Sequence, residues 1–324
     1  MDALPIVEEN DLEFKSKTQN MHACGHDMHT AMLLGAAQLL KNHEDEIEGT
    51  VKLVFQPAEE TLWGAKAMIE AGVLENPKVD AAMMIHVAGG MPIPSGIVAI
   101  PGAGTVSAAS DWFKIKVSGK GGHGAMPDLS VDPINVLAHI HIALQEINSR
   151  EVAPAENLAL TVGQIHGGNT SNVIPDDAFM SGTVRTYSNE TREFVKNRLT
   201  EISEGIASTF RATVEVEYTK GCPCLIADED LTKQIFEYSK EMMGEDKVID
   251  MGKLTSGKKI AGSEDFAFFS EHVPTASVSV GAGSPAEGYL FPHHHPKIIF
   301  NEDALTIGAA VYANTAINWL KNNK

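Results

Sequence analysis

Residues 22–55 read HACGHDMHTAMLLGAAQLLKNHEDEIEGTVKLVF, and this stretch joins a polar loop, an amphipathic helix and an apolar segment. From Met28 to Leu40 the apolar residues recur at helical spacing. A Glu-Gly pair ends that pattern, and VKLVF (51–55) then predicts a buried strand. A helix followed directly by a buried strand is typical of an α/β sheet with helices on its faces.

The same alternation continues at both ends of the chain. GAKAMIEA (64–71) predicts a short helix, and VDAAMMIHV (79–87) predicts a second buried strand. Near the C-terminus PTASVSVGAG (274–283) predicts a strand, and residues 303–320 predict a long amphipathic helix with Asn301 as a candidate cap. Strands that alternate with helices over short turns predict a parallel sheet.

The middle of the chain has a different pattern. Its predicted elements are strand, helix, strand, strand, helix and strand, over 113–117, 131–147, 158–165, 178–187, 190–209 and 213–218. That order is the ferredoxin-like split motif. The fold class is therefore α/β. We expect an α/β domain made of residues 1–107 and 219–324, with an α+β ferredoxin-like domain inserted at 108–218.

Composition limits the partners. The chain has 324 residues, of which 43% are hydrophobic and 21% charged, so it can bury the cores of two globular domains. Its formal net charge of −18 argues against nucleic acid and against an anionic membrane surface. No apolar run approaches the ~18 residues of a membrane span. Residues 1–14 lack the pattern of a signal peptide, and three cysteines make no disulfide framework, so we expect a cytoplasmic protein.

Metal-type ligands are dense in HACGHDMH (22–29), where Cys24 and His26 stand two residues apart. In an extended segment both side chains point to the same side. Thiolate and imidazole are good ligands for a borderline divalent ion such as zinc. The alternative is a polar helix start, with Asp27 as the cap and the histidines in solvent.

Further polar residues follow other predicted strands. Glu59 and Glu60 in QPAEE come directly after VKLVF, and His86 ends the next strand. Residues 293–295 are three histidines in a loop after the last strand. A solvated helix start would explain the glutamates equally well, and a core position would explain His86. Because parallel strands present their carboxyl ends at one edge, however, these residues can converge with Cys24. One cysteine, three histidines and a carboxylate are enough to bind two ions.

Several runs carry a family resemblance. They are MDALP, MHACGHDMHTAMLLGAA, QPAEE, IHV, GGHGAMP, NVIP, GTVRTY, GSEDF and HHHPKIIFNEDAL, in this order along the whole chain. Together they resemble the aminoacylase and carboxypeptidase family of two-metal peptidases, peptidase family M20. The nearest branch is the amidohydrolase one, with hippurate hydrolases, N-acetyldiaminopimelate deacetylases and auxin-conjugate hydrolases. The resemblance implies a catalytic domain of the zinc-exopeptidase type, with residues 108–218 as a lid or dimerisation domain.

The resemblance also implies roles for individual residues. The implied ligands of two divalent ions, zinc or manganese, are Cys24, His26, Glu60, His86 and His294. Glu59 would be the general acid/base in the hydrolysis of the amide bond of a small N-acyl amino acid. The chain would form a homodimer or a higher homo-oligomer.

The inserted domain contributes three more candidates. GKGGHG (119–124) matches a dinucleotide-binding pattern only formally, because Pro127 interrupts before any helix begins. By resemblance, His123 in this loop would reach a catalytic site, that of the partner subunit; the alternative is a histidine in solvent. Asn172 and Arg185 would bind the carboxylate of the substrate, since a guanidinium pairs with it bidentately. A structural salt bridge is the alternative for Arg185.

Two competing hypotheses remain open. In the first, Cys24 is a nucleophile with His26 or His86 as its base. In the second, the chain is a catalytically impaired homologue that acts as a binding or dimerisation module. The second arises because the family resemblance implies further strands ahead of Met1, so that we expect an exposed sheet edge.

Overall fold

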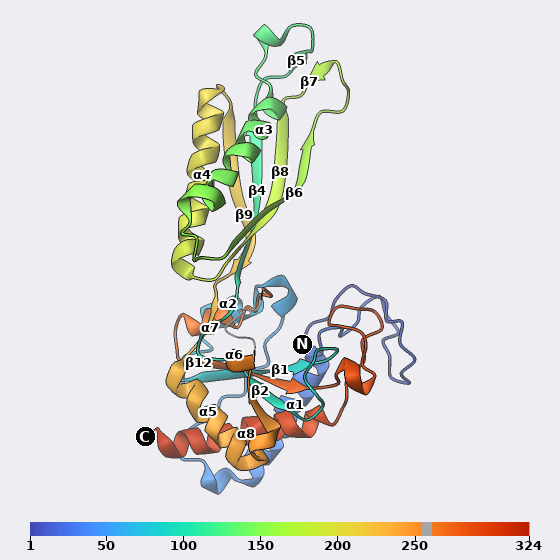
Figure 1. The fold of residues 1–324 in the computed structure, drawn as a ribbon, viewed down its shortest axis with the longest axis vertical. Helices are drawn as coiled ribbons and strands as arrows, with labels where there is room; N and C mark the ends of the chain where they lie inside the picture. The colour runs from blue at the N-terminus through green and yellow to red at the C-terminus, as the bar shows by residue number, and fades with distance from the viewer. Residues whose placement is uncertain (255–260, 324) are drawn as a thin grey trace. The chain divides into compact units, whose positions relative to one another are not determined.

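The computed structural model in Figure 1 describes residues 1–254 and 261–323. Within them the chain divides into two compact units. Unit 1 holds residues 1–106, 226–254 and 265–323, and unit 2 holds residues 107–225 and 261–264.

Unit 1 is built on a four-stranded sheet with the order β1-β12-β2-β11. Its strands are β1 (Ala82–Ala88), β12 (Thr275–Gly281), β2 (Val98–Ile100) and β11 (Val248–Asp250). The pairs β1–β12 and β2–β11 are parallel, whereas β12 and β2 are antiparallel. The sheet is therefore mixed, which differs from the wholly parallel sheet that the alternation of strands and helices predicts.

Among the described residues, four helices contact this sheet: α1 (His26–Asn42), α5 (Glu229–Met243), α6 (Met251–Leu254) and α8 (Ala304–Asn322). The short helices α2 (Gly64–Glu70) and α7 (Ala267–Ser270) contact each other. The apolar stripe predicted for α1 is confirmed, because Met28, Met32 and Leu40 are buried. Met32 belongs to one core cluster with Ile85 of β1. No helix among the residues that the structure describes combines the length and the apolar character needed to cross a membrane.

The strand predicted at 51–55 is wrong. These residues form no strand, and the side chains of Leu53 and Phe55 are 36% and 42% exposed. Lys52 Nζ instead donates to the carbonyl of Val73 at 2.8 Å and ties the segment to a turn. An apolar run becomes a buried strand only where a neighbouring strand offers a hydrogen-bond ladder, and the described residues offer none to this segment.

No strand of the described residues pairs with the outer edge of β1, yet N–H groups along this edge have partners. Their hydrogen bonds are accepted by side chains from two helices and a loop, where a neighbouring strand would otherwise supply carbonyl oxygens. The pairs are Ile85 N–H with Tyr312 Oη at 2.8 Å, Val87 N–H with His29 Nε2 at 3.0 Å, and Gly89 N–H with His293 Nε2 at 3.1 Å. These contacts satisfy the backbone of the strand that carries His86.

Unit 2 has the β-α-β-β-α-β order predicted from the sequence. Its main elements are β4 (Ala109–Ser118), α3 (Pro133–Ala143), β6 (Leu158–Gly167), β8 (Asp177–Thr186), α4 (Asn189–Thr209) and β9 (Thr213–Cys222). The sheet order is β6-β8-β4-β9, and the pairs β6–β8, β8–β4 and β4–β9 are all antiparallel. The short strands β5 (Gly122–His123) and β7 (Val173–Ile174) pair with each other, as do β3 (Gly104–Ser107) and β10 (Leu225–Ala227).

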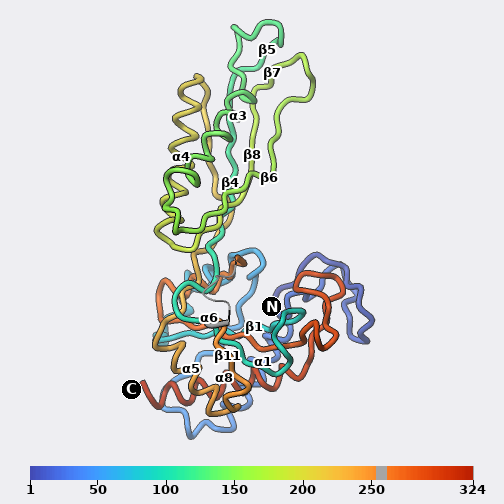
Figure 2. The backbone as a smooth tube through the Cα atoms, in the orientation of Figure 1, coloured from blue at the N-terminus to red at the C-terminus, as the bar shows by residue number. Residues whose placement is uncertain are grey.

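Helices α3 and α4 cover one face of the unit 2 sheet, as the tube in Figure 2 shows. Phe113, Ile115 and Val117 of β4 are buried in the core on that face. Trp112, Lys114 and Lys116 alternate with them and therefore point to the opposite face. One face of the sheet thus stays uncovered by the helices of unit 2.

A buried ion pair gives a testable measure of the stability of unit 2. Asp111 is 3% exposed, and Arg192 donates to its two oxygens from Nε at 2.7 Å and from Nη2 at 2.8 Å. Asp111→Ala leaves the guanidinium buried without its partner, so we expect the free energy of unfolding in urea to fall by about 3–5 kcal/mol. Asp177→Ala, which breaks an exposed pair with Lys116, is the control and should cost less than about 1 kcal/mol. Equal losses in the two variants would contradict this account.

Candidate metal centre

The loop before α1 places Cys24 and His26 on either side of a glycine. Gly25 has a φ of 81°, and a Cβ atom there would lie 2.4 Å from Val87 Cγ2. Only glycine fits this position, because the conformation is left-handed and the space is closed. His26 is the first residue of α1 and is 8% exposed.

Asp2 fixes the orientation of His26. Asp2 Oδ1 lies 2.5 Å from His26 Nδ1, and its Oδ2 accepts the N–H of Glu60 at 3.0 Å. Burial raises the pKa of Asp2, but these hydrogen bonds outweigh burial and lower the pKa to about 2. The ionised carboxylate holds the proton of His26 on Nδ1, which leaves Nε2 with a lone pair for a metal ion.

MDALP carries part of the family resemblance, but its aspartate has no role predicted from the sequence. Asp2 stands 24 residues before His26, and nothing in the local pattern indicates their contact. The signal that could have found it is chemical: a histidine that ligates a metal usually donates its other ring N–H to a carboxylate or a carbonyl.

His86 is held in the corresponding way from β1. Its Nδ1 lies 2.7 Å from the carbonyl oxygen of Val87, so this nitrogen carries the proton and Nε2 is left as an acceptor. His86 Nε2 is 3.6 Å from Cys24 Sγ. Burial lowers the pKa of His86 to about 4, which keeps the ring neutral and suited to ligation at neutral pH.

The two glutamates lie in a strained turn. Glu59–Thr61 forms one turn of 3₁₀ helix, and Ala58 and Leu62 on its two sides have a φ of 57°. Such left-handed conformations in residues other than glycine cost free energy and cluster at functional sites. Glu59 Oε2 lies 3.8 Å from His26 Nε2.

Asp265 makes hydrogen bonds to the segments on both sides of this turn. It is fully buried and accepts Gln56 Nε2 at 2.5 Å and the N–H of Ala65 at 3.0 Å, one on each side of Glu59 and Glu60. Burial raises its pKa to about 6, against these two hydrogen bonds. Asp265 therefore supports the turn that carries Glu59 and Glu60.

His294 completes the cluster from the C-terminal loop. Its φ is 66°, its N–H donates to the carbonyl of Ala23 at 2.9 Å, and its Nε2 lies 3.4 Å from Glu60 Oε1. The neighbouring histidines have other contacts. His293 accepts the N–H of Gly89, and the ring of His295 stacks on Phe291.

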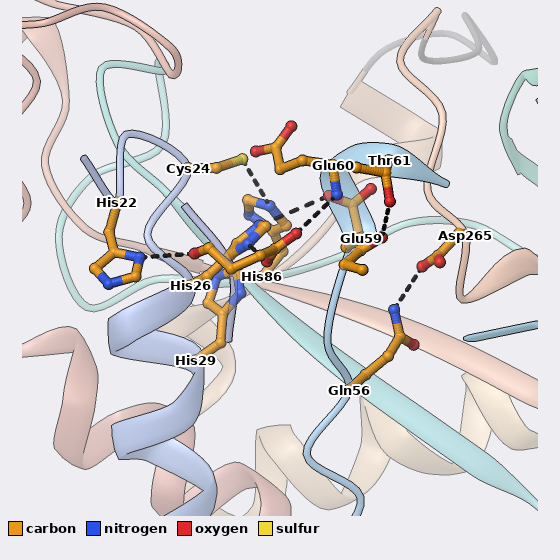
Figure 3. Close-up of polar contacts among 12 residues, drawn as sticks. His22, Cys24, His26, His29, Gln56, Glu59, Glu60, Thr61, His86 and Asp265 are labelled. Carbon is orange, nitrogen blue, oxygen red and sulfur yellow. Dashed lines mark hydrogen bonds and ion pairs between the residues drawn. The ribbon is translucent and has the colours of Figure 1, made fainter. Parts of the chain in front are cut away.

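Two groups of ligand atoms meet at Cys24. Figure 3 shows Cys24 together with His26, His86 and Glu60. One group is Cys24, His26 and His86, and the other is Cys24, Glu60 and His294. Within each group the ligand atoms lie within 4.8 Å of one another, and a third such group joins His26 to Glu59 and Glu60. All five predicted ligands and the predicted base thus come together in unit 1.

The residues fit divalent ions. Glu60 Oε1 is buried and accepts no hydrogen bond from the described residues, so a cation would satisfy it. Imidazoles with oriented lone pairs, a thiol and a carboxylate are the ligands that zinc and similar ions bind.

Unit 2 places the three remaining candidates at two distant positions. His123 and Asn172 lie together, since β5 pairs with β7 and the N–H of Gly124 donates to the Asn172 carbonyl at 2.9 Å. Strand β8 begins at Asp177, at the end of the sheet where β7 carries the chain away from Asn172. Arg185 lies near the opposite end of β8, eight residues further along the strand. Eight residues of strand span about 26 Å. One copy of unit 2 therefore does not bring Asn172 and Arg185 to the same carboxylate.

A mixed α/β unit with clustered Cys, His and Glu ligands beside a second glutamate, Glu59, defines a metallohydrolase. Residues 1–318 match the model of Peptidase family M20/M25/M40, and the chain belongs to this family. The resemblance seen in the sequence is thereby confirmed. The chain is a metal-dependent hydrolase that acts on amides.

Curated relatives cover almost the whole chain. "Thermostable carboxypeptidase 1" of Saccharolobus solfataricus is 37% identical, over 98% of this chain and 79% of its own length. "N-acetyl-L-cysteine deacetylase" of Bacillus subtilis is 38% identical, over 100% and 74%. "IAA-amino acid hydrolase ILR1-like 4" of Arabidopsis thaliana is 39% identical, over 99% and 71%.

Solved structures confirm the predicted fold class. A putative aminohydrolase from methicillin-resistant Staphylococcus aureus superposes with a TM-score of 0.89 at 34% identity, over 98% of this chain and 79% of its own. A Bacillus subtilis protein described as a dinuclear metal binding peptidase from the M20 family has a TM-score of 0.79 at 32% identity, over 99% and 79%. This neighbour and the family support two divalent ions in the present chain.

Proposed function

We propose that the protein hydrolyses the amide bond of small N-acyl amino acids, with two zinc or manganese ions held by Cys24, His26, Glu60, His86 and His294. The observation that carries the proposal is the meeting of two ligand groups at Cys24, beside Glu59. The names of two relatives, a deacetylase of N-acetyl-L-cysteine and a hydrolase of IAA-amino acids, support an amino acid acylated on nitrogen.

In this proposal the ions, when bound, polarise the amide carbonyl and lower the pKa of a water molecule. Glu59 is the base. Its Oε2 lies 3.8 Å from His26 Nε2, at the edge of the ligand cluster, where it accepts the proton of the attacking water. Glu59 then returns this proton to the nitrogen of the leaving amine, so the carboxylate is regenerated in each cycle.

His123 and Asn172 act, in this proposal, on the site of a neighbouring copy. His123 Nδ1 accepts the N–H of Ala125 at 3.0 Å, so Nε2 carries the proton and can donate to the oxygen of the tetrahedral intermediate. Exposed apolar side chains lie near this loop in the chain: Met126 is 53% exposed and Val173 is 51% exposed. Such residues favour an interface with a second copy, as a homodimer or a higher oligomer in the cytoplasm.

A panel of substrates tests the proposal. The metal-loaded protein is incubated with N-acetyl, N-benzoyl and indole-acyl amino acids, and the free amino acid is measured. We expect turnover of at least one class, and its loss in Glu59→Gln. If no member of the panel were hydrolysed by protein that carries metal, the proposed substrate class would be wrong.

Asp2→Asn tests how His26 is oriented. The amide keeps the size of the side chain but loses the charge that holds the proton of His26 on Nδ1. We expect the affinity for metal, measured by competition with a chelator, to fall by about 10- to 100-fold. Asp11→Asn, at an exposed residue, is the control and should match the parent protein. Unchanged affinity in Asp2→Asn would show that Asp2 does not orient the ligand.

A further inference from the structure

Four side chains gather at one end of the uncovered face of the unit 2 sheet. Ser110 and Trp112 stand two apart on β4, so both point to this face. Arg185 of β8 lies directly opposite Ser110, and Lys220 of β9 lies directly opposite Trp112. Directly opposed residues of antiparallel strands share a face, so all four lie on the face away from α3 and α4. We refer to these four residues as the cation corner.

Within the part of the chain that the structure describes, the two positive charges of the cation corner lack a negative partner. No carboxylate of residues 1–254 or 261–323 lies within 4.0 Å of the nitrogens of Arg185 or Lys220, whereas Lys116 on the same face pairs with Asp177. Arg185 Nη1 donates to Ser263 Oγ at 2.9 Å, a neutral contact that holds the guanidinium in place. Burial and the charge of Arg185 together lower the pKa of Lys220.

The salt-bridge alternative for Arg185 therefore has no support among the described residues. Only Nη1 of its guanidinium has acceptors there, which are Ser263 Oγ and the carbonyl of Ala261 at 3.5 Å. The remaining nitrogens can still donate to an anion.

The cation corner also holds two buried polar groups that have no partner among the described residues. Trp112 Nε1 and Ser110 Oγ are both buried, and neither has a hydrogen-bond partner in the described part of the chain. Lys220 Nζ lies 3.0 Å from the centroid of the Trp112 ring, so lysine and indole form one unit. An indole N–H can donate a hydrogen bond but cannot accept one, and the same is true of the two cations. The group that would satisfy this set is an acceptor that carries negative charge.

We propose that Lys220, together with Arg185 and Trp112, binds the free α-carboxylate of the N-acyl amino acid, which makes Lys220 a residue that determines specificity. This inference rests on the proposed function, which supplies a substrate with one such carboxylate. Arg185 provides the planar fork for the carboxylate, and Lys220 adds a second charge held in place by the indole. The protein should therefore discriminate strongly against substrates whose carboxylate has been converted to an amide.

Binding to a variant that cannot turn over tests this directly. Metal-loaded Glu59→Gln protein is titrated calorimetrically with N-acetylalanine and with N-acetylalanine amide, with and without Lys220→Gln. We expect Lys220→Gln to weaken binding of the acid by about 10- to 100-fold and that of the amide by less than about 3-fold. Lys116→Gln, on the same strand face, is the matched control and should leave both affinities within about 2-fold.

The same change in the active protein should raise KM for the acid while kcat stays within a few-fold. Equal binding of the acid with and without Lys220, or an equal loss for acid and amide, would overturn the inference. If the parent protein hydrolyses N-acyl amino acids but Lys220→Gln has no effect, this inference alone fails. If Lys220-dependent binding of the acid is found without any hydrolysis, the site stands and the proposed function fails.

Discussion

Glu59→Gln is expected to keep its metal and to lose about 10³-fold in kcat. The glutamine has the same shape as the glutamate but cannot accept the proton of the attacking water, and a positioned base contributes about 10²- to 10⁴-fold. Glu59 is not part of the two ligand groups that meet at Cys24, so its charge is not needed to complete either one. The measurements are kcat on the best substrate of the panel and elemental analysis of the same sample.

Glu60→Gln is the matched control for this variant, one residue away. Glu60 belongs to the group with Cys24 and His294, so its loss should reduce both metal content and turnover. The pair of variants therefore separates the base from the ligand. Turnover of Glu59→Gln within about 10-fold of the parent would refute its role as the base.

Removal of metal by a chelator is expected to abolish hydrolysis, and addition of zinc or manganese should restore it. No side chain among residues 1–254 and 261–323 would polarise the amide as strongly as a divalent ion. Dialysis against the chelator, followed by buffer without it, gives the apo protein, and rates are measured before and after each ion is added. A loss of less than about 10-fold in fully apo protein would contradict metal-dependent catalysis.

The chelation experiment also distinguishes metal-dependent hydrolysis from the hypothesis in which Cys24 is the nucleophile. Cys24 Sγ lies 3.6 Å from His86 Nε2, a geometry that a thiol and its base could share. If Cys24 were the nucleophile, alkylation would stop turnover without loss of metal, and chelation would leave turnover intact. Cys222 and Cys224 are buried, whereas Cys24 is partly exposed, so the reagent should select Cys24.

Elements with a regular local pattern could be predicted from the sequence. The stripe of α1 and the strand–helix order of unit 2 follow from spacings of three, four and two residues, which each segment carries within itself. Asp132 and Pro133 likewise indicate the start of α3. The aspartate is the N-cap, and its side chain accepts a hydrogen bond from the N–H of Ile134. These features depend little on the rest of the chain.

Features that depend on distant neighbours could not be predicted in this way. VKLVF has the composition of a buried strand, but its conformation depends on whether another strand lies beside it. The contact of Asp2 with His26 and the proximity of Arg185 to Lys220 come from tertiary contact and strand register. Residue types in the motifs indicate metal chemistry, whereas the sharing of Cys24 between two groups appears only in three dimensions.

The number of metal ions in the purified, active protein tests the central claim most directly. Elemental analysis of protein purified without chelator, with concentration from amino-acid analysis, gives this number without any assumption about substrate. Two ligand groups that meet at Cys24 predict about two divalent ions per chain, and fewer in Glu60→Gln. Active protein without stoichiometric metal would contradict the account.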